Sequence, residues 1–369
     1  MSPSQVLPRR PRVVAMGSTE YRIDDYVAEY ERTLTLRYAP PCTPLRMQSR
    51  ADADGVLDAE NRDEALQKLP AMVQQHGPID ALVVGVGTAE FEPFDEALLR
   101  PLLPGCRIIA SASAGYDEFD VAWMTRAGIW FCNTRDAVAE ATADMAMFLT
   151  LAVVRDAYRA ERGARSGTWR DGIVPARDPS GMTMGIVGMG AVGRHLARKA
   201  AAFSMRVRYY NRRRLSIDDE AACNAKYTPS LHELLASADV VSINCPLTEE
   251  TANLISDAEF AAMKPGAFFV NTARGAIVDE AALIDALESG RVARAGLDVF
   301  CNEPHINGYF RTSDLVVCTP HVGAVTDEAF RRGERECLEN VRACLRTGRP
   351  VAPVNEVRAD VNGVAGSEG

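Results

Sequence analysis

The chain has 369 residues, of which 47% are hydrophobic and 25% charged, and its formal net charge is −9 at pH 7. This length favours two domains over one compact core, and the acidic balance argues against a general nucleic-acid or anionic-membrane surface. The nine cysteines show no C-x-x-C spacing. We therefore expect no metal site, no disulfide framework and a reducing, cytoplasmic location.

The most apolar stretch is 145–154, and ten residues are too few to cross a bilayer. The first residues carry positive charge but lack the hydrophobic segment of a secretory signal. We interpret them, and the residues after Val357, as short disordered tails. A membrane-spanning protein is not predicted.

Short apolar runs alternate with helical patterns through the first part of the chain. We predict buried strands at 12–16, 79–87, 107–113 and 129–133, and helices at 20–32, 59–76, 95–100 and 118–127. A long helical region is expected from about 137 to 163, followed by a stretch rich in Gly, Arg and Pro. This alternation is typical of a mostly parallel sheet.

A second alternating series follows that break and is long enough for a complete doubly wound domain. Its predicted strands lie at 183–188, 206–211, 239–245, 266–272, 293–300 and 314–320. Its predicted helices lie at 191–203, 230–237, 256–263, 279–289 and 325–346. The expected fold class is α/β, with two doubly wound parallel-sheet domains of the Rossmann or flavodoxin-like kind and a cleft between them.

The stretch "GIVGMGAVGRHLARKAAAF" holds Gly188, Gly190 and Gly193 in G-x-G-x-x-G spacing. Alone, such spacing also occurs in ordinary turns where glycine supplies positive φ. Here a predicted strand comes directly before Gly188 and a strong helix pattern follows Gly190. Strand, tight turn and helix are what a dinucleotide pyrophosphate requires, because the turn and the free N–H groups at the helix start face the anion.

The next strand ends where a dinucleotide site reads the adenosine ribose, and there the sequence is "RYYNRRRL". A carboxylate would accept from the 2′-hydroxyl of NADH and repel a 2′-phosphate. Asn211, Arg212 and Arg213 stand there instead, and guanidinium groups match phosphate geometry. NADP(H) is therefore favoured, NAD(H) stays open, and a solvated basic loop is the simpler alternative.

Ligands of open α/β sheets bind beyond the carboxyl ends of the strands, so the residues there are the catalytic candidates. Arg274, Glu303 and His321 follow three successive predicted strands. If the reaction is reduction of a 2-oxo acid, a protonated imidazole supplies the proton and a neighbouring carboxylate favours that protonated ring. An arginine holds the substrate carboxylate or carbonyl.

Each of these three residues also has a simpler interpretation, as a solvated turn, a capping acid or a loop histidine. Their joint placement at successive strand ends is hard to explain without a shared site. Among the other histidines, His195 and His232 fall on helices and His76 in a turn, while His305 is the serious rival.

With these motifs in place, the chain resembles the D-isomer-specific 2-hydroxyacid dehydrogenases. The stretches "GIVGMGAVG", "MKPGAFFVNTARGAIVDEAALIDAL", "GLDVFCNEP" and "TPHVG" carry the resemblance, which extends over roughly residues 80–350. Within this family, the closer resemblance is to the glyoxylate/hydroxypyruvate reductase branch. The resemblance implies an NAD(P)-dependent enzyme that converts a 2-oxo acid to the D-2-hydroxy acid.

The resemblance also implies roles for particular residues and domains. Catalysis falls on Arg274, Glu303 and His321, and the substrate carboxylate on Arg274 and on the backbone N–H groups of Ala114 and Gly115, with Gly87 and Thr88 a weaker alternative. Besides the three motif glycines, the implied cofactor contacts are Thr142, Ala191, Val192, Asn211, Arg212, Arg213, Cys245, Pro246, Thr251, Thr272, Ala273, Asp298, His321 and Gly323.

The implied substrate domain is discontinuous, at 1–136 plus 325–369, and the implied dinucleotide-binding domain is 137–324. A homodimer with its contact near 137–180 is expected. Two features depart from the family: an insert at 305–308 and an aromatic loop in which Phe91 and Phe94 either line a larger substrate site or pack the loop. A dinucleotide-sensing, corepressor-like binding protein of the same fold is the alternative function.

Overall fold

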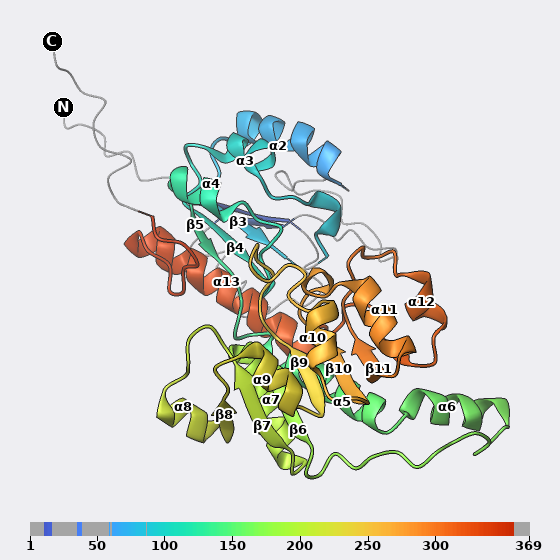
Figure 1. Cartoon of the computed structure of the whole chain (residues 1–369). Helices are drawn as coiled ribbons and strands as arrows, with labels where there is room; N and C mark the ends of the chain where they lie inside the picture. Colours follow the sequence, from blue (N-terminus) through green and yellow to red (C-terminus); the bar gives the residue numbers. More distant parts are fainter. Residues whose placement is uncertain (1–10, 17–34, 39–58, 60, 86, 358–369) are drawn as a thin grey trace, which may run out of the picture. The chain divides into compact units, whose positions relative to one another are not determined.

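The computed structural model describes residues 11–16, 35–38, 59, 61–85 and 87–357. The chain divides into two compact units (Figure 1). Unit 1 comprises Met1–Val138 and Asp327–Gly369, and unit 2 comprises Ala139–Thr326. The helix expected at 20–32 and both expected tails lie outside the described residues. No helix in the described ranges combines the length and the apolar character needed to cross a membrane.

The described part of unit 1 contains a parallel sheet of five strands in the order β2-β1-β3-β4-β5. The strands are β1 (Arg12–Met16), β2 (Thr35–Tyr38), β3 (Ala81–Val84), β4 (Ile108–Ser111) and β5 (Trp130–Cys132). This is the flavodoxin-like strand order, whose carboxyl edge is the usual ligand-binding edge.

Helices cover both faces of this sheet. They are α2 (Arg62–His76), α3 (Glu96–Leu99), α4 (Val121–Arg126) and α13 (Asp327–Thr347), with 3₁₀ turns η1 (Ala89–Phe91) and η2 (Arg100–Leu102). Val14 and Met16 pack with residues of α2, α3 and α4, whereas Val13 and Ala15 pack with α13. A strand points alternate side chains to opposite faces, so the C-terminal helix completes the unit that the N-terminal strands begin (Figure 1).

Unit 2 contains a parallel sheet of seven strands, in the order β12-β11-β10-β9-β6-β7-β8. The strands are β6 (Thr183–Val187), β7 (Arg206–Tyr210), β8 (Ala225–Tyr227), β9 (Val240–Ile243), β10 (Ala267–Asn271), β11 (Val292–Leu297) and β12 (Val316–Cys318). The order reverses between β6 and β9, as at the switch point of a Rossmann sheet. The two doubly wound parallel sheets confirm the predicted fold class.

The helices of unit 2 also lie on both sheet faces. They are α5 (Ala139–Val154), α6 (Ala157–Ser166), α7 (Ala191–Ala202), α8 (Ile217–Ala222), α9 (Leu231–Ser237), α10 (Asp257–Ala262), α11 (Glu280–Glu288) and α12 (Gly308–Thr312), with the 3₁₀ turn η3 (Gly275–Ile277). One core cluster joins α5 and α7 to the sheet, and another joins α9, α10 and α11 to its other face. The sheet is thereby buried on both sides, which explains its continuous apolar strands.

The helical region expected over about 137–163 consists of two helices, because α5 ends at Val154 and α6 begins at Ala157. Asp156, between them, has a left-handed backbone with φ of 51°, a conformation that aspartate tolerates better than most residues. Its buried carboxylate accepts from the Nη2 of Arg294 at 2.8 Å. This long-range ion pair holds the break, and α6 extends away from the sheet of unit 2 (Figure 1).

Several short elements were not predicted, namely β2, β8, α8 and α12. Strand β8 has three residues, none fully buried, so it lacks an apolar pattern. Helix α12 begins directly after Asn307, whose side chain accepts from the Tyr309 N–H, so the insert at 305–308 leads into a helix. Phe91 and Phe94 are both buried in the core of unit 1, which settles their open interpretation in favour of packing.

Candidate active site

The three motif glycines occupy three different environments. A Cβ at Gly188, where φ is 97°, would stand 2.5 Å from the backbone nitrogen of Cys245, and one at Gly193 would stand 2.4 Å from the carbonyl oxygen of Gly188. Only glycine fits either position. A Cβ at Gly190 would meet no described atom within 4 Å. The first and third glycines therefore allow close packing, and the second leaves open space in front of the loop.

Helix α7 begins at Ala191, directly after Gly190, and no side chain caps its start. Its first N–H groups and the positive end of its dipole thus remain available to an anion. The loop itself is held from the next strand, because the backbone N–H of Met189 donates to Oδ1 of Asn211 at 3.1 Å. Asn211 therefore positions the glycine loop, a role that the sequence does not reveal.

The three arginines after Asn211 differ in their surroundings. Arg214 donates to both carboxylate oxygens of Glu220, at 2.8 and 2.9 Å, and lies over the ring of Tyr227. Arg212 and Arg213 are exposed. Arg212 also lies close enough to Cys245 for its charge to favour the thiolate, although burial prevails and raises the pKa of that thiol to about 11. The basic loop thus offers two exposed guanidinium groups beside the glycine loop.

The loop after β9 holds the next predicted cofactor residues together. The hydroxyl of Thr251 donates to the carbonyl of Pro246 at 2.7 Å and accepts from the N–H of Thr248 at 2.7 Å. At the start of this loop the Oδ1 of Asn244 is buried, as is the Oγ1 of Thr272 after β10, and neither has a hydrogen-bond partner among the described residues. Such buried polar atoms require an explanation, and both lie at the carboxyl edge of the sheet.

Arg274 follows β10, and the last residue of that strand holds its turn. The buried side chain of Asn271 accepts from the Ala273 N–H at 3.0 Å and donates to the Arg274 carbonyl at 2.9 Å. The next residue, Gly275, is pressed against the neighbouring chain, since a Cβ there would stand 2.0 Å from the carbonyl carbon of Phe300. This close approach brings Arg274 beside the segment that carries Glu303.

His321 and Glu303 form a hydrogen-bonded pair, with 2.7 Å between Nδ1 of His321 and Oε2 of Glu303. The other oxygen of Glu303 accepts from the Phe300 N–H at 2.8 Å. Partial burial opposes the charge on Glu303, but the hydrogen bonds from His321 and Phe300 and the nearby charge of Arg274 outweigh it and lower its pKa. The three residues predicted from the strand ends therefore lie together within unit 2.

The backbone of His321 is left-handed, with φ of 53°, and Asp298 holds the loop around it. Asp298 is buried immediately after β11, rather than within the strand as expected. Its carbonyl accepts from the His321 N–H at 2.7 Å. Its carboxylate accepts from the Thr319 hydroxyl at 2.6 Å, the Val322 N–H at 3.0 Å and the Gly323 N–H at 2.8 Å.

The remaining predicted site residues lie at other places in the two units. Thr142 is in α5, and a Cβ at Gly323 would lie 3.6 Å from its methyl group. His305 is an exposed loop residue in unit 2. In unit 1, Ala114 and Gly115 are half-buried in the loop after β4, where Asn133 Nδ2 donates to the Ala114 carbonyl at 2.6 Å. No group of described side chains is suited to hold a metal ion.

These features fit a dinucleotide. The Gly188 turn, the open space at Gly190, the uncapped start of α7 and the exposed Arg212 and Arg213 provide a turn, room and positive charge for phosphate groups. The unpartnered Thr272 hydroxyl supplies a further polar group at the same sheet edge. The residues of unit 2 that would hold the cofactor are therefore those that follow β6, β7, β9 and β10.

Comparisons with known proteins identify the family. The family model for the D-isomer specific 2-hydroxyacid dehydrogenase NAD binding domain matches residues 147–323. The chain is 51% identical to a dehydrogenase of Hormonema carpetanum, efuE, over 97% of this chain and 84% of the relative.

Two solved structures are similar over nearly the whole chain. A glyoxylate reductase from Paecilomyes thermophila has a TM-score of 0.83 and 34% identity, over 94% of this chain and 99% of that one. The holo form of Rhodotorula graminis D-mandelate dehydrogenase has a TM-score of 0.83 and 31% identity, over 95% and 99%. These likenesses confirm the prediction of an oxidoreductase that uses a nicotinamide dinucleotide: the chain belongs to the D-isomer-specific 2-hydroxyacid dehydrogenase family.

Proposed function

We propose that this enzyme reduces a 2-oxo acid to the D-2-hydroxy acid, with His321 as proton donor, Glu303 as the partner of His321 and Arg274 as the substrate anchor. The 2.7 Å contact between Nδ1 of His321 and Oε2 of Glu303 is the observation that carries the proposal. A histidine paired with a carboxylate in this way is the usual acid–base arrangement for reactions near neutral pH.

The contact assigns separate tasks to the two ring nitrogens of His321. Because Glu303 occupies Nδ1, the proton for the substrate oxygen is carried on Nε2. Glu303 favours the protonated ring and orients it. Transfer of the proton leaves a neutral ring that remains hydrogen-bonded to Glu303 and is protonated again from solvent, in keeping with its partial exposure.

Arg274 binds the negative charge of the substrate. Its guanidinium donates charge-assisted hydrogen bonds to the carboxylate or to the carbonyl oxygen, where charge develops during reduction. We propose that the backbone N–H groups of Ala114 and Gly115, braced by Asn133, bind the substrate carboxylate from unit 1. The nicotinamide dinucleotide, when bound, supplies the hydride.

We propose that the cofactor is NADP(H) in preference to NAD(H). The carboxylate that would bind a ribose 2′-hydroxyl is replaced by Asn211, whose Oδ1 accepts from the glycine loop. Arg212 and Arg213 are exposed beside that loop and provide the positive charge that a 2′-phosphate requires. In this proposal unit 1 is the substrate domain and unit 2 the dinucleotide-binding domain.

We further propose a cytoplasmic homodimer. The eight described cysteines are all free, which supports a reducing compartment. Of the ten large hydrophobic side chains that are exposed in the described part of the chain, five lie between residues 148 and 174, namely Phe148, Tyr158, Trp169, Ile173 and Val174. Exposed apolar groups concentrated in one segment are typical of a protein–protein contact.

A spectrophotometric screen tests the function directly. Purified protein is assayed at 340 nm with NADPH and with NADH, each against glyoxylate, hydroxypyruvate, 4-methyl-2-oxopentanoate and phenylglyoxylate. We expect oxidation of NADPH with at least one 2-oxo acid. Chiral analysis should give the D-isomer for every reduced substrate except glyoxylate, whose product is achiral. The His321→Asn variant, which lacks the proposed proton donor, serves as the inactive control. Cofactor binding without turnover on any 2-oxo acid would contradict the proposal and favour the sensing alternative.

A further inference from the structure

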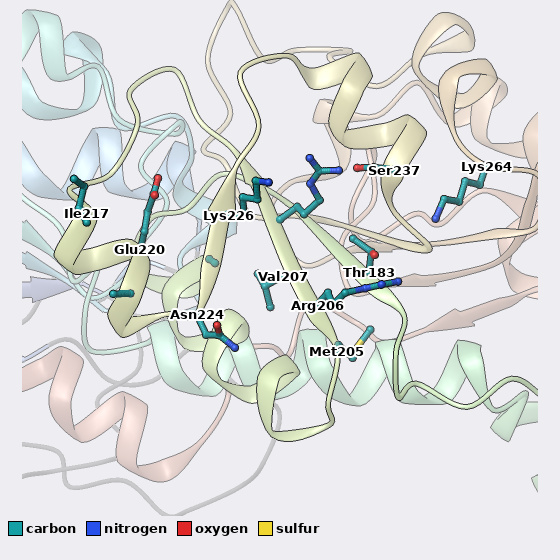
Figure 2. Close-up of a pocket in the computed structure, with 13 residues that line it drawn as sticks. Thr183, Met205, Arg206, Val207, Ile217, Glu220, Asn224, Lys226, Ser237 and Lys264 are labelled. Atoms are coloured by element: carbon teal, nitrogen blue, oxygen red, sulfur yellow. The ribbon is translucent and has the colours of Figure 1, made fainter.

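A basic groove lies at the opposite edge of the unit 2 sheet from the predicted active site. It has a volume of about 800 Å³. Figure 2 shows Arg206, Lys226, Ser237 and Lys264 around it, and Arg208 completes its cationic lining. Thr183 and Arg206 are the first residues of β6 and β7, and Lys264 precedes β10. The catalytic residues and the glycine loop follow the carboxyl ends of strands, so this groove is a separate site.

The strand register places three cations on one face of the sheet. Arg208 and Lys226 are direct Cα partners in the parallel pairing of β7 and β8, and Arg206 lies two residues before Arg208. Side chains two apart in a strand, and side chains of paired positions, share a face. Like charges placed directly opposite each other destabilise a sheet. A bound anion at this three-residue edge strand would offset that repulsion.

Glu220, in the groove lining, and Asp239, which is bonded to two lining residues, are already engaged by other groups. Glu220, which lines the groove, accepts from Arg214 and from the Tyr209 hydroxyl. Asp239 accepts from Lys264 at 3.1 Å and from the Thr183 N–H at 2.8 Å. Arg206 donates to the Gly181 carbonyl at 2.8 Å. The Nε of Arg208 is buried with no hydrogen-bond partner in the described part of the chain.

We propose that this groove binds a phosphate group, either as inorganic phosphate or as part of a small phosphate monoester. The functional groups of Arg206, Arg208 and Lys226 are cationic hydrogen-bond donors, whereas the Ser237 hydroxyl already donates to the Leu234 carbonyl at 2.9 Å. A phosphate is nearly dianionic at pH 7 and offers several acceptor oxygens, so it neutralises these charges better than one carboxylate does. The size of the groove suits a small metabolite.

Isothermal titration of the full-length enzyme with inorganic phosphate tests the proposal. Every protein carries Arg212→Ala and Arg213→Ala, which remove the proposed cofactor phosphate contacts, and ionic strength is held constant with NaCl. We expect one phosphate to bind and Arg208→Gln with Lys226→Gln to weaken it by about tenfold or more, because two charge-assisted contacts are lost. Thermal unfolding without phosphate should show the double variant folded, since it relieves a like-charge pair.

The matched control is Arg311→Gln with Arg346→Gln, which removes the same charge from exposed positions outside the groove. It should bind phosphate like the parent. A second titration with glycerol 2-phosphate distinguishes the two possible ligands. Binding tighter than that of inorganic phosphate indicates that the ligand is a monoester, and weaker binding indicates the free ion. Equal phosphate affinity in the groove variant and its control, or no binding by the parent, would overturn the proposal, as would tighter binding of malonate than of phosphate.

Discussion

At the scale of single residues, Glu303 divides its two carboxylate oxygens between His321 and the backbone of its own turn. Burial opposes its charge, but the hydrogen bonds and Arg274 outweigh burial and lower its pKa. Glu303 therefore stays ionised through the neutral range, and its contribution is lost only as pH falls through that lowered pKa. The imidazole consequently has an anionic partner at every pH where a reductase normally works.

The pH dependence of 2-oxo acid reduction should report this pairing. Glu303→Gln keeps a hydrogen-bond acceptor but removes the charge that favours the protonated ring of His321. The alkaline limb of the rate profile should lie at lower pH in the variant than in the parent enzyme. The rate is measured from pH 5 to 10 at saturating cofactor. An alkaline limb that stays in place would show that Glu303 does not tune the proton donor.

Cofactor choice is a second property set by single residues. Replacing Arg212 and Arg213 by alanine should weaken NADPH by about a hundredfold and NADH by less than about threefold, because only NADPH carries the 2′-phosphate that these guanidinium groups bind. Dissociation constants from fluorescence titration check this, with Arg311→Ala as a control at another exposed arginine. An equal loss for both cofactors would dismiss the phosphate contact.

At the scale of elements, the glycine loop couples strand β6 to helix α7 through two glycines that no other residue can replace without displacement. Gly193→Ala places a methyl group on the Gly188 carbonyl and should destabilise the enzyme by about 2 kcal/mol. Gly190→Ala meets only open space, so its melting temperature should stay near that of the parent while cofactor affinity falls sharply.

Thermal unfolding and cofactor titration of the two alanine variants separate these effects. If Gly190→Ala melted as early as Gly193→Ala, the inference that open space surrounds Gly190 would be wrong. If Gly190→Ala bound the cofactor normally, the pyrophosphate would not approach the loop there. The pair therefore tests the loop without depending on turnover.

Elements were predictable where burial is continuous along the chain. All five residues of β6 are buried, and its strand was expected within one residue of its observed end. Strand β8 was missed because its residues are half-exposed, and the break between α5 and α6 was missed because the partner of Asp156 is Arg294, 138 residues away. Local patterns carry no information about such a distant contact.

The candidate site was likewise predictable only in part. Arg274, Glu303 and His321 could be predicted because parallel strands bring their carboxyl ends to one edge. The bracing groups Asn271 and Thr319 could not, because their hydrogen bonds depend on turn conformations that the sequence does not specify. Both are polar residues at or just beyond the end of a buried strand, and that position is the signal that could have drawn attention to them.

At the scale of the whole molecule, charge and exposed apolar surface are unevenly distributed. The chain carries a net charge of −9, yet one groove of unit 2 is lined by four basic side chains among the described residues. Trp169 is 67% exposed and Val174 is 62% exposed, both beyond α6. An acidic surface keeps molecules apart in general, so a specific contact must come from a local apolar region of this kind.

Light scattering in line with size-exclusion chromatography tests the dimer. The parent should have twice the mass of one chain, and Phe148→Ser with Trp169→Ser should have the mass of a single chain, because these exposed side chains would be buried by the partner. Phe203→Ser with Ile217→Ser removes two other exposed apolar groups of unit 2, which are 42% and 79% exposed, and should leave a dimer. A parent chain that elutes as a monomer would refute the homodimer.

The left-handed backbone at His321 has a consequence for the outcome of random substitution there. Side chains branched at Cβ are strained in that conformation, whereas asparagine, aspartate and glycine accept it readily. In a saturation library at this codon, the valine, isoleucine and threonine variants should therefore be less stable than the asparagine, aspartate and glycine variants by about 1–2 kcal/mol. All of these variants lack the imidazole, so their order of stability reports the backbone conformation of the loop independently of catalysis.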